Sequence, residues 1–175
     1  MGNYGKIWAA AILWLCTGLW GWAHATVLTL DQARVELTVD GRSTSAEVRL
    51  PYGWDYLQKG RSGVGRFELD FDGPSAATEP WGLYFNRLGN AYVVTFNGVV
   101  LEKNGTLEAD DFSDYAKAPR FLLIPPNLLL THNHLEITIR SDSGRRAGVP
   151  VVQVGPKDEV EPAYRKEFGL RVVGT

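Results

Sequence analysis

Cysteine is almost absent from this sequence: Cys16 is the single one among 175 residues, and it lies within an apolar N-terminal stretch. A lone cysteine cannot form a disulfide within the chain. The residues after that stretch have no thiol, so a catalytic cysteine and a thiolate metal site are excluded there. That part must fold on its hydrophobic core alone, which a chain of about 150 residues can do.

The sequence also lacks a large excess of either charge. Its 18 Lys and Arg residues nearly balance 20 Asp and Glu residues, for a formal net charge of −2. Lys6 is the one charged side chain of the first 25 residues, so the rest carries 17 − 20 = −3. Such a mildly acidic chain is not expected to bind nucleic acid.

The first 25 residues have the pattern of a signal peptide. Ile7–Trp22 is apolar and uncharged, and Ala23-His24-Ala25 follows it with the small-x-small pattern that signal peptidase cleaves. An uncleaved anchor is the alternative, although the apolar run is shorter than the roughly 20 residues of a typical span. We expect cleavage before Thr26 and a periplasmic or extracellular location.

Residues 26–155 consist of short segments in which apolar and polar residues alternate. In Arg66–Phe71, for example, Phe67, Leu69 and Phe71 share one face, and charged residues occupy the other. Turn signals separate roughly seven to nine such segments, which is typical of an all-β antiparallel sandwich.

One hairpin is expected at the centre of this domain. Tyr92–Phe96 and Val99–Leu101 flank Asn97-Gly98, a pair that tolerates the two positive φ angles of a type I′ turn. Tyr92, Val94 and Phe96 would face the core together.

Prolines and glycines predict where regular structure stops. Pro51 and Gly53 should end a strand, and Lys59–Gly65 should form a loop. Residues 156–175 are expected to be a partly helical C-terminal connector, in which Pro162 disfavours one continuous helix.

The order of several motifs is more specific than any one of them. It resembles the galactose-binding-domain-like jelly roll, as in the sugar-binding domain of family 2 glycoside hydrolases. The motifs are Leu50-Pro51 with Trp54, Gly63-x-Gly-x-Phe67-x-Leu-x-Phe71, Trp81-x-Leu-Tyr-Phe85, Ala91-x-Val-x-x-Phe-Asn97-Gly98 and Leu135-x-Ile-x-Ile139. The resemblance implies a jelly-roll sandwich that accompanies a separate catalytic domain.

Two features depart from those hydrolases. Thr131-His132-Asn133 stands where Gly-x-Asn is usual, and the tail after Gly155 has no counterpart. That tail and the leader make the chain similar to the extracytoplasmic sensor domains of bacterial membrane-bound histidine kinases and diguanylate cyclases. This second resemblance implies a membrane-embedded continuation of the same polypeptide.

Residue patterns for catalysis or metal binding are weak. Glu108, Asp110 and Asp111 lie in a polar loop, where nothing fixes the separation that two glycosidase carboxylates need. His132 and His134 share a strand face, but zinc would require a third ligand without a cue in the sequence. We expect no enzyme activity, no metal and no cofactor.

Aromatic and amide side chains in the loops suggest a ligand site. A rim of this kind suits a saccharide, whose ring stacks on an aromatic face while amides bind its hydroxyls, or a small anionic ligand held by arginine. The predicted ligand-binding residues are Trp54, Arg61, Asn86, Arg87 and Asn90. Burial of Trp54 in the core is the alternative for that residue.

These observations give two expectations for function. The first is a non-catalytic extracytoplasmic module that senses a ligand or partner for a membrane-bound signalling protein. The second is a free-standing secreted carbohydrate-binding module.

Overall fold

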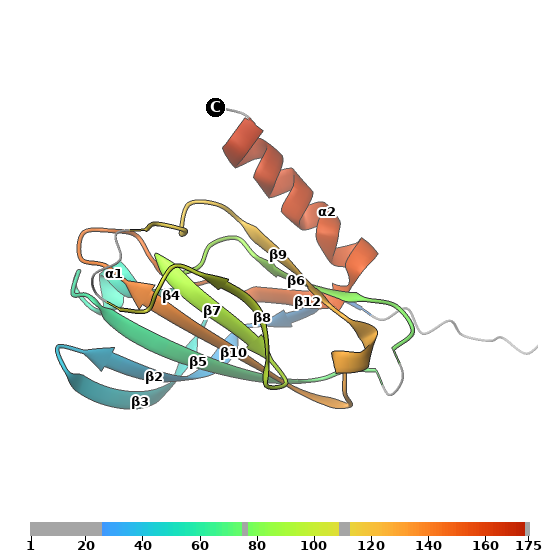
Figure 1. The fold of residues 1–175 in the computed structure, drawn as a ribbon, viewed down its shortest axis with the longest axis horizontal. Coiled ribbons are helices and arrows are strands. Elements are labelled where there is room, and N and C mark those ends of the chain that lie inside the picture. Colours follow the sequence, from blue (N-terminus) through green and yellow to red (C-terminus); the bar gives the residue numbers. More distant parts are fainter. Residues whose placement is uncertain (1–25, 75–76, 109–112, 174–175) are drawn as a thin grey trace, which may run out of the picture.

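The computed structural model describes residues 26–74, 77–108 and 113–173 and has the predicted all-β architecture, a sandwich of two antiparallel sheets (Figure 1). The predicted signal peptide lies outside the described residues. The larger sheet has the strand order β3-β2-β5-β10-β7-β8. Its strands are β2 (Gln32–Val39), β3 (Arg42–Arg49), β5 (Gly63–Asp72), β7 (Ala91–Phe96), β8 (Val99–Asn104) and β10 (His132–Ser141).

The smaller sheet has the order β1-β12-β6-β9, so the chain passes repeatedly between the two sheets. Its strands are β1 (Leu28–Leu30), β6 (Trp81–Phe85), β9 (Arg120–Ile124) and β12 (Val152–Pro156). A separate two-stranded ladder joins β4 (Tyr52–Gly53) to β11 (Gly148–Val149). The ladder lies beside α1 (Trp54–Leu57), at the same end of the larger sheet as the first residues of β5.

The core lies between the two sheets, and the alternation of the sequence fills it. Tyr92, Val94 and Phe96 are fully buried on β7, as predicted. Asn97 and Gly98 adopt φ angles of 46° and 81°, the left-handed pair that the predicted hairpin turn requires. The hairpin therefore forms where the sequence places it, with β8 extending beyond the predicted arm to Asn104.

The predicted loop at Lys59–Gly65 is wrong in its second half, because β5 begins at Gly63. The reason is tertiary packing. A Cβ atom at Gly63 would lie 2.5 Å from the Thr38 carbonyl oxygen and 2.8 Å from the Trp54 ring, and one at Gly65 would lie 2.9 Å from the same ring. These glycines are strand residues that make room for the indole of α1, rather than flexible loop residues.

The predicted interruption at Pro162 is also wrong, since α2 (Lys157–Phe168) runs through it and continues as the π-helical turn η2 (Gly169–Val173). Proline removes one hydrogen bond from the helix, but packing on the smaller sheet offsets that loss. Tyr164 stacks on Phe121 at a ring distance of 5.7 Å, and Val160 is fully buried. The C-terminal segment thus covers the outer face of the smaller sheet (Figure 1).

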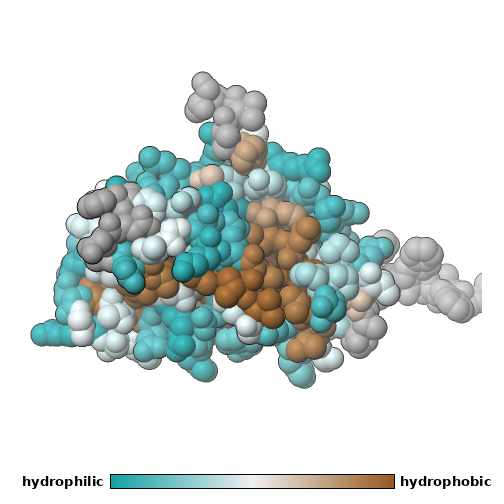
Figure 2. Space-filling model, viewed as in Figure 1, coloured by the Kyte–Doolittle hydropathy of each residue, from teal (hydrophilic) through white to brown (hydrophobic). Residues whose placement is uncertain are grey.

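Apolar side chains gather on one side of the sandwich, over β8, β9 and the 3-10 turn η1 (Pro126–Leu128) (Figure 2). Val100, Leu123 and Leu130 are each about half exposed there. β8 and β9 are outer strands of their sheets, so this surface covers open edges rather than the closed core. No helix among the described residues is both long enough and apolar enough to cross a membrane.

Candidate functional site

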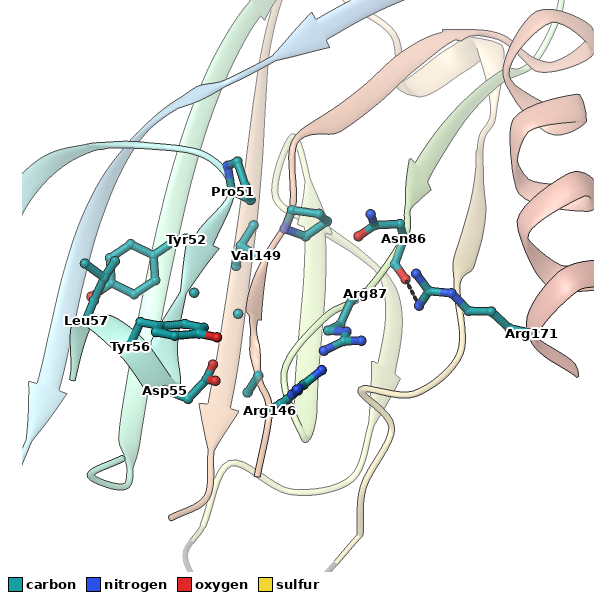
Figure 3. Close-up of a pocket in the computed structure, with 14 residues that line it drawn as sticks. Pro51, Tyr52, Asp55, Tyr56, Leu57, Asn86, Arg87, Arg146, Val149 and Arg171 are labelled. Atoms are coloured by element: carbon teal, nitrogen blue, oxygen red, sulfur yellow. Dashed lines mark hydrogen bonds between the residues drawn. The ribbon is translucent and has the colours of Figure 1, made fainter. Parts of the chain in front are cut away.

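A cavity of about 590 Å³ opens at the end of the sandwich that carries α1 (Figure 3). Segments far apart in the sequence meet there: the β4–α1 region, the loop after β6, β11 with its flanking residues, and η2. The lining residues are Pro51, Tyr52, Gly53, Asp55, Tyr56, Leu57, Asn86, Arg87, Arg146, Ala147, Gly148, Val149, Pro150 and Arg171. Its volume falls within the range of about 300–1,000 Å³ that is usual for small-molecule sites.

One wall of the cavity is aromatic and acidic. Tyr56 projects from α1 with 82% of its surface exposed, and the Asp55 carboxylate lies beside it in Figure 3. Tyr52 lies behind them, buried, and its hydroxyl accepts a hydrogen bond from Gln58 Nε2 at 2.6 Å. Burial raises the pKa of Tyr52 above its ordinary value, with the Gln58 contact acting in the opposite direction, so this hydroxyl stays neutral. This wall therefore presents the exposed Tyr56 ring to solvent, next to the Asp55 carboxylate, which can accept hydrogen bonds.

The opposite wall is basic. Arg87, Arg146 and Arg171 reach it from three different segments (Figure 3). Arg171 is fixed, because its guanidinium donates to the Asn86 carbonyl at 3.1 Å and pairs with Glu167 at 2.5 Å. Arg87 and Arg146, in contrast, have no hydrogen bond or ion pair with any other part of the chain that the structure describes.

The floor of the cavity depends on close backbone contact between β4 and β11. Gly148 pairs with Gly53 in this ladder. A Cβ atom at Gly148 would lie 2.1 Å from the Tyr52 carbonyl oxygen, so only glycine fits. Val149, which follows Gly148, lies between the tyrosines of the aromatic wall and the arginines of the basic wall in Figure 3.

A second hollow of about 480 Å³ adjoins the first and shares Arg87 and Arg146 with it. The other described lining residues are Asp114, Ala116, Lys117, Gly144 and Arg145. The two hollows therefore form a groove across the loop end of the sandwich, with the two shared arginines at its middle.

The structure places the five predicted ligand-binding residues in different environments. Asn86 and Arg87 line the cavity. Trp54 is 1% exposed and donates its indole N–H to the Arg61 carbonyl at 2.7 Å, so its ring belongs to the core. The Arg61 side chain pairs with Asp40 at 3.3 Å outside the cavity lining.

Asn90, the fifth predicted residue, is fully buried and joins three loops. Its amide donates to Asp114 at 2.9 Å, and its side-chain oxygen accepts from the Asp142 N–H at 2.9 Å. Burial alone would raise the pKa of Asp114, but the hydrogen bonds from the Asn90 amide and the Ala116 N–H, with the nearby Lys117 and Arg145, hold that pKa below its ordinary value. Asn90 therefore positions the loops of the groove and does not present its amide to a ligand.

The cavity residues that sequence reasoning left out of its list of ligand-binding residues include Asp55, Tyr56, Arg146 and Arg171. Tyr56 and Asp55 follow Trp54 directly, so a one-turn helix that buries the indole must turn its next residues outward. Arg146 belongs to a loop that the sequence marks as basic. Arg171 has no such cue, because its position depends on how α2 packs.

The two histidines considered for zinc lie on the outer face of the larger sheet. His132 pairs with Asp72 at 2.5 Å and His134 with Asp70 at 2.7 Å. The structure also shows which residues could act as further metal ligands beside a histidine. The potential ligand atoms of Glu68, His134 and Glu136 lie within 4.8 Å of one another.

Arg66 already occupies the neighbourhood of these carboxylates. Its guanidinium lies 3.4 Å from Glu68 and 3.9 Å from Glu136. We therefore assign this group to the ion pairs of the sheet surface and assign no metal to it. Asp110 and Asp111 lie outside the described residues.

Comparisons with solved structures give the class of fold. A GH2 β-galacturonidase from Eisenbergiella tayi bound to glycerol matches 76% of this chain with a TM-score of 0.57 at 12% identity, over 24% of its own length. A β-glucuronidase from Ruminococcus gnavus in complex with D-glucuronic acid matches 77% with a TM-score of 0.55 at 12% identity, over 30% of its length. The β-D-glucuronidase of Dictyoglomus thermophilum matches 77% with a TM-score of 0.53 at 14% identity, over 28% of its length.

The chain thus has the β-sandwich fold of one part of these glycosidases, and it spans between about a quarter and a third of their length. This agrees with the first family resemblance drawn from the motifs. The likeness to sensor domains stays a prediction. Neither a protein-family model nor a curated protein matches the sequence.

Proposed function

We propose that the chain is a non-catalytic saccharide-binding module whose site is the cavity between α1 and the arginine wall. The observation that carries this proposal is Tyr56, an aromatic ring left 82% exposed at the edge of a cavity with convergent polar groups. Large aromatic rings are normally buried, because their burial contributes strongly to stability. A ring held outward on a one-turn helix is suited to stack on the apolar face of a sugar.

The polar groups around Tyr56 complete the recognition. The Asp55 carboxylate accepts hydrogen bonds from sugar hydroxyls, and the exposed Asn86 amide both donates and accepts. Asp55 is the one carboxylate among the described residues that line the cavity. Hydrolysis of a glycoside ordinarily requires two carboxyl groups around one bond, so binding without hydrolysis is the function that this lining supports.

The structural neighbours support a saccharide as the ligand class. The Ruminococcus gnavus enzyme is in complex with D-glucuronic acid, and the Eisenbergiella tayi β-galacturonidase has also been solved bound to galacturonate; both ligands are sugars with a carboxylate. We carry over the ligand class alone, because each of those proteins is three to four times longer than the part matched.

The experiment is isothermal titration calorimetry, in which neutral and acidic oligosaccharides are titrated one at a time into the purified chain. Tyr56→Ala is expected to lower the affinity of any saccharide that binds by about tenfold or more, because it removes the stacking surface. Leu130→Ala is the matched control, because Leu130 is an exposed apolar residue that lies outside the cavity lining, two residues before β10; it should change nothing. Equal affinities of the wild type and Tyr56→Ala would place any saccharide site elsewhere.

A second candidate function is the sensing module of a membrane-bound protein, which Arg171 favours. This residue lines the cavity and belongs to the helical segment that follows the sandwich. A ligand that contacts Arg171 would change how firmly this segment is held, and α2 would transmit the change. Addition of ligand is expected to slow amide hydrogen exchange in residues 157–173. A ligand-induced change in exchange that is confined to the loops would contradict this function.

A further inference from the structure

We propose that the ligand of this cavity carries an anionic group, a carboxylate, sulfate or phosphate, which Arg87 and Arg146 bind together. This inference rests on the proposed function and specifies the chemical class of the saccharide. Its basis is a pair of guanidinium groups that converge on one place without a partner among the described residues.

The arginines of this region differ in what they contact. Arg140 and Arg145 are held by Asp142 at 2.9 and 3.6 Å, and Arg171 is held by Glu167. Arg87 and Arg146 are the exceptions in the described groove. An arginine that serves only packing or solubility does not need a second positive charge beside it. Two guanidinium groups on one wall, neither paired with a described residue, therefore suggest a binding role.

The location of the pair strengthens this inference. Arg87 follows β6 and is half-buried, whereas Arg146 precedes β11 and is exposed. Both line the first hollow and also the second, so they stand where the two meet. In Figure 3 the two side chains project into the same part of the cavity, opposite the wall that carries Tyr56.

Like charges in a shared, partly enclosed space repel, and an anion between them relieves the repulsion. Each guanidinium presents a planar fork of N–H donors that matches the oxygens of carboxylate, sulfate or phosphate. The second hollow adds Lys117 and Arg145 against one carboxylate, that of Asp114, which pairs with Lys117 at 3.8 Å, so its lining is also net positive. A sugar stacked on Tyr56 would direct its acidic substituent across the cavity to this pair.

Asp55 on the opposite wall gives the site a direction. An anionic group is repelled by Asp55 and attracted to the arginines, whereas neutral sugar hydroxyls can donate hydrogen bonds to the Asp55 carboxylate. The cavity therefore distinguishes the two ends of an acidic sugar, and a neutral sugar loses the contacts of the basic wall.

The test compares digalacturonate with its dimethyl ester, which has the same rings without the charge, and with inorganic phosphate. All are titrated calorimetrically into the full chain at low and at moderate salt. The acid is expected to bind at least about tenfold more tightly than the ester. Salt is expected to weaken the binding of the acid but not that of the ester. Arg87→Gln and Arg146→Gln should each remove most of that difference.

Arg34→Gln is the control for a change of one charge, because Arg34 is an exposed residue on the larger sheet that pairs with Glu47. Equal binding of acid and ester, unaffected by either cavity variant, would overturn the anionic class and leave the saccharide proposal standing. Binding of phosphate alone, lost in the cavity variants and kept in Arg34→Gln, would support the anion site and remove the saccharide. No binding of any probe would overturn both proposals.

Discussion

Arg140 is the residue whose replacement tests most directly how the groove is built. Its side chain is 3% exposed at the end of β10 and makes two contacts to the Asp142 carboxylate, at 2.9 and 3.2 Å. It also donates to three carbonyl oxygens of the β8–β9 connection, those of Thr106, Glu108 and Ser113, at 2.6, 3.0 and 3.2 Å. One buried cation thus holds the connection against the end of the larger sheet.

The magnitude follows from these contacts. Arg140→Met keeps much of the volume but removes every hydrogen bond that Arg140 donates to Asp142 and to the three carbonyls. Asp142 and the Ser113 carbonyl keep their longer contacts with Arg145, at 3.6 and 3.4 Å. Removing one partner of a buried ion pair typically costs about 3–5 kcal/mol. Asp142 is 23% exposed and gains some hydration, so we expect the lower end, about 3 kcal/mol. For a domain of this size that corresponds to a fall in Tm of roughly 6–12 °C.

Urea denaturation of the purified chain, followed by circular dichroism, measures this change in the free energy of unfolding. Arg34→Met is the matched control in the same sheet, because its pair with Glu47 is exposed at both ends and should cost below about 1 kcal/mol. If Arg140→Met lost no more stability than Arg34→Met, the reasoning that a single cation anchors the groove would be refuted. A larger loss with an unchanged m-value would support it.

Two further predictions concern the core and the acid limit of stability. Phe96→Ala should lower the free energy of unfolding by about 3–5 kcal/mol because Phe96 is fully buried, whereas Val100→Ala on the exposed edge should stay within about 0.5 kcal/mol; similar urea midpoints for the two would contradict the assigned core. The pKa of Asp114 is lower in the folded chain than in the unfolded one, so its stabilisation is present above the ordinary carboxyl pKa and is lost as the pH falls through the folded value. Asp114→Asn should therefore flatten the acid side of a plot of Tm against pH, and parallel curves for variant and wild type would show that Asp114 does not contribute to it.

The fold was predictable because its strands and turns depend mainly on residues close together in the sequence. Each strand of a two-layer sandwich buries one face, so Phe67, Leu69 and Phe71 had to alternate with charged residues whatever the neighbouring strands were. The turn at Asn97 and Gly98 was equally local, since it depends on the φ angles that these two residues tolerate. Errors occurred where a distant contact decided the outcome, as when the Trp54 ring required glycine at positions 63 and 65.

The site was only partly predictable, because it is assembled from loops that follow different strands. The sequence by itself determined the sandwich, its core and an aromatic and basic character for the loops, since these depend on residue type and spacing. Only the tertiary structure decided that Trp54 turns inward while Tyr56 turns outward, and that Arg87, Arg146 and Arg171 converge. The physical reason is that convergence depends on strand order and on the docking of α2, which are set by packing between distant segments. The contact of Arg171 with Asn86, for example, joins residues 85 positions apart.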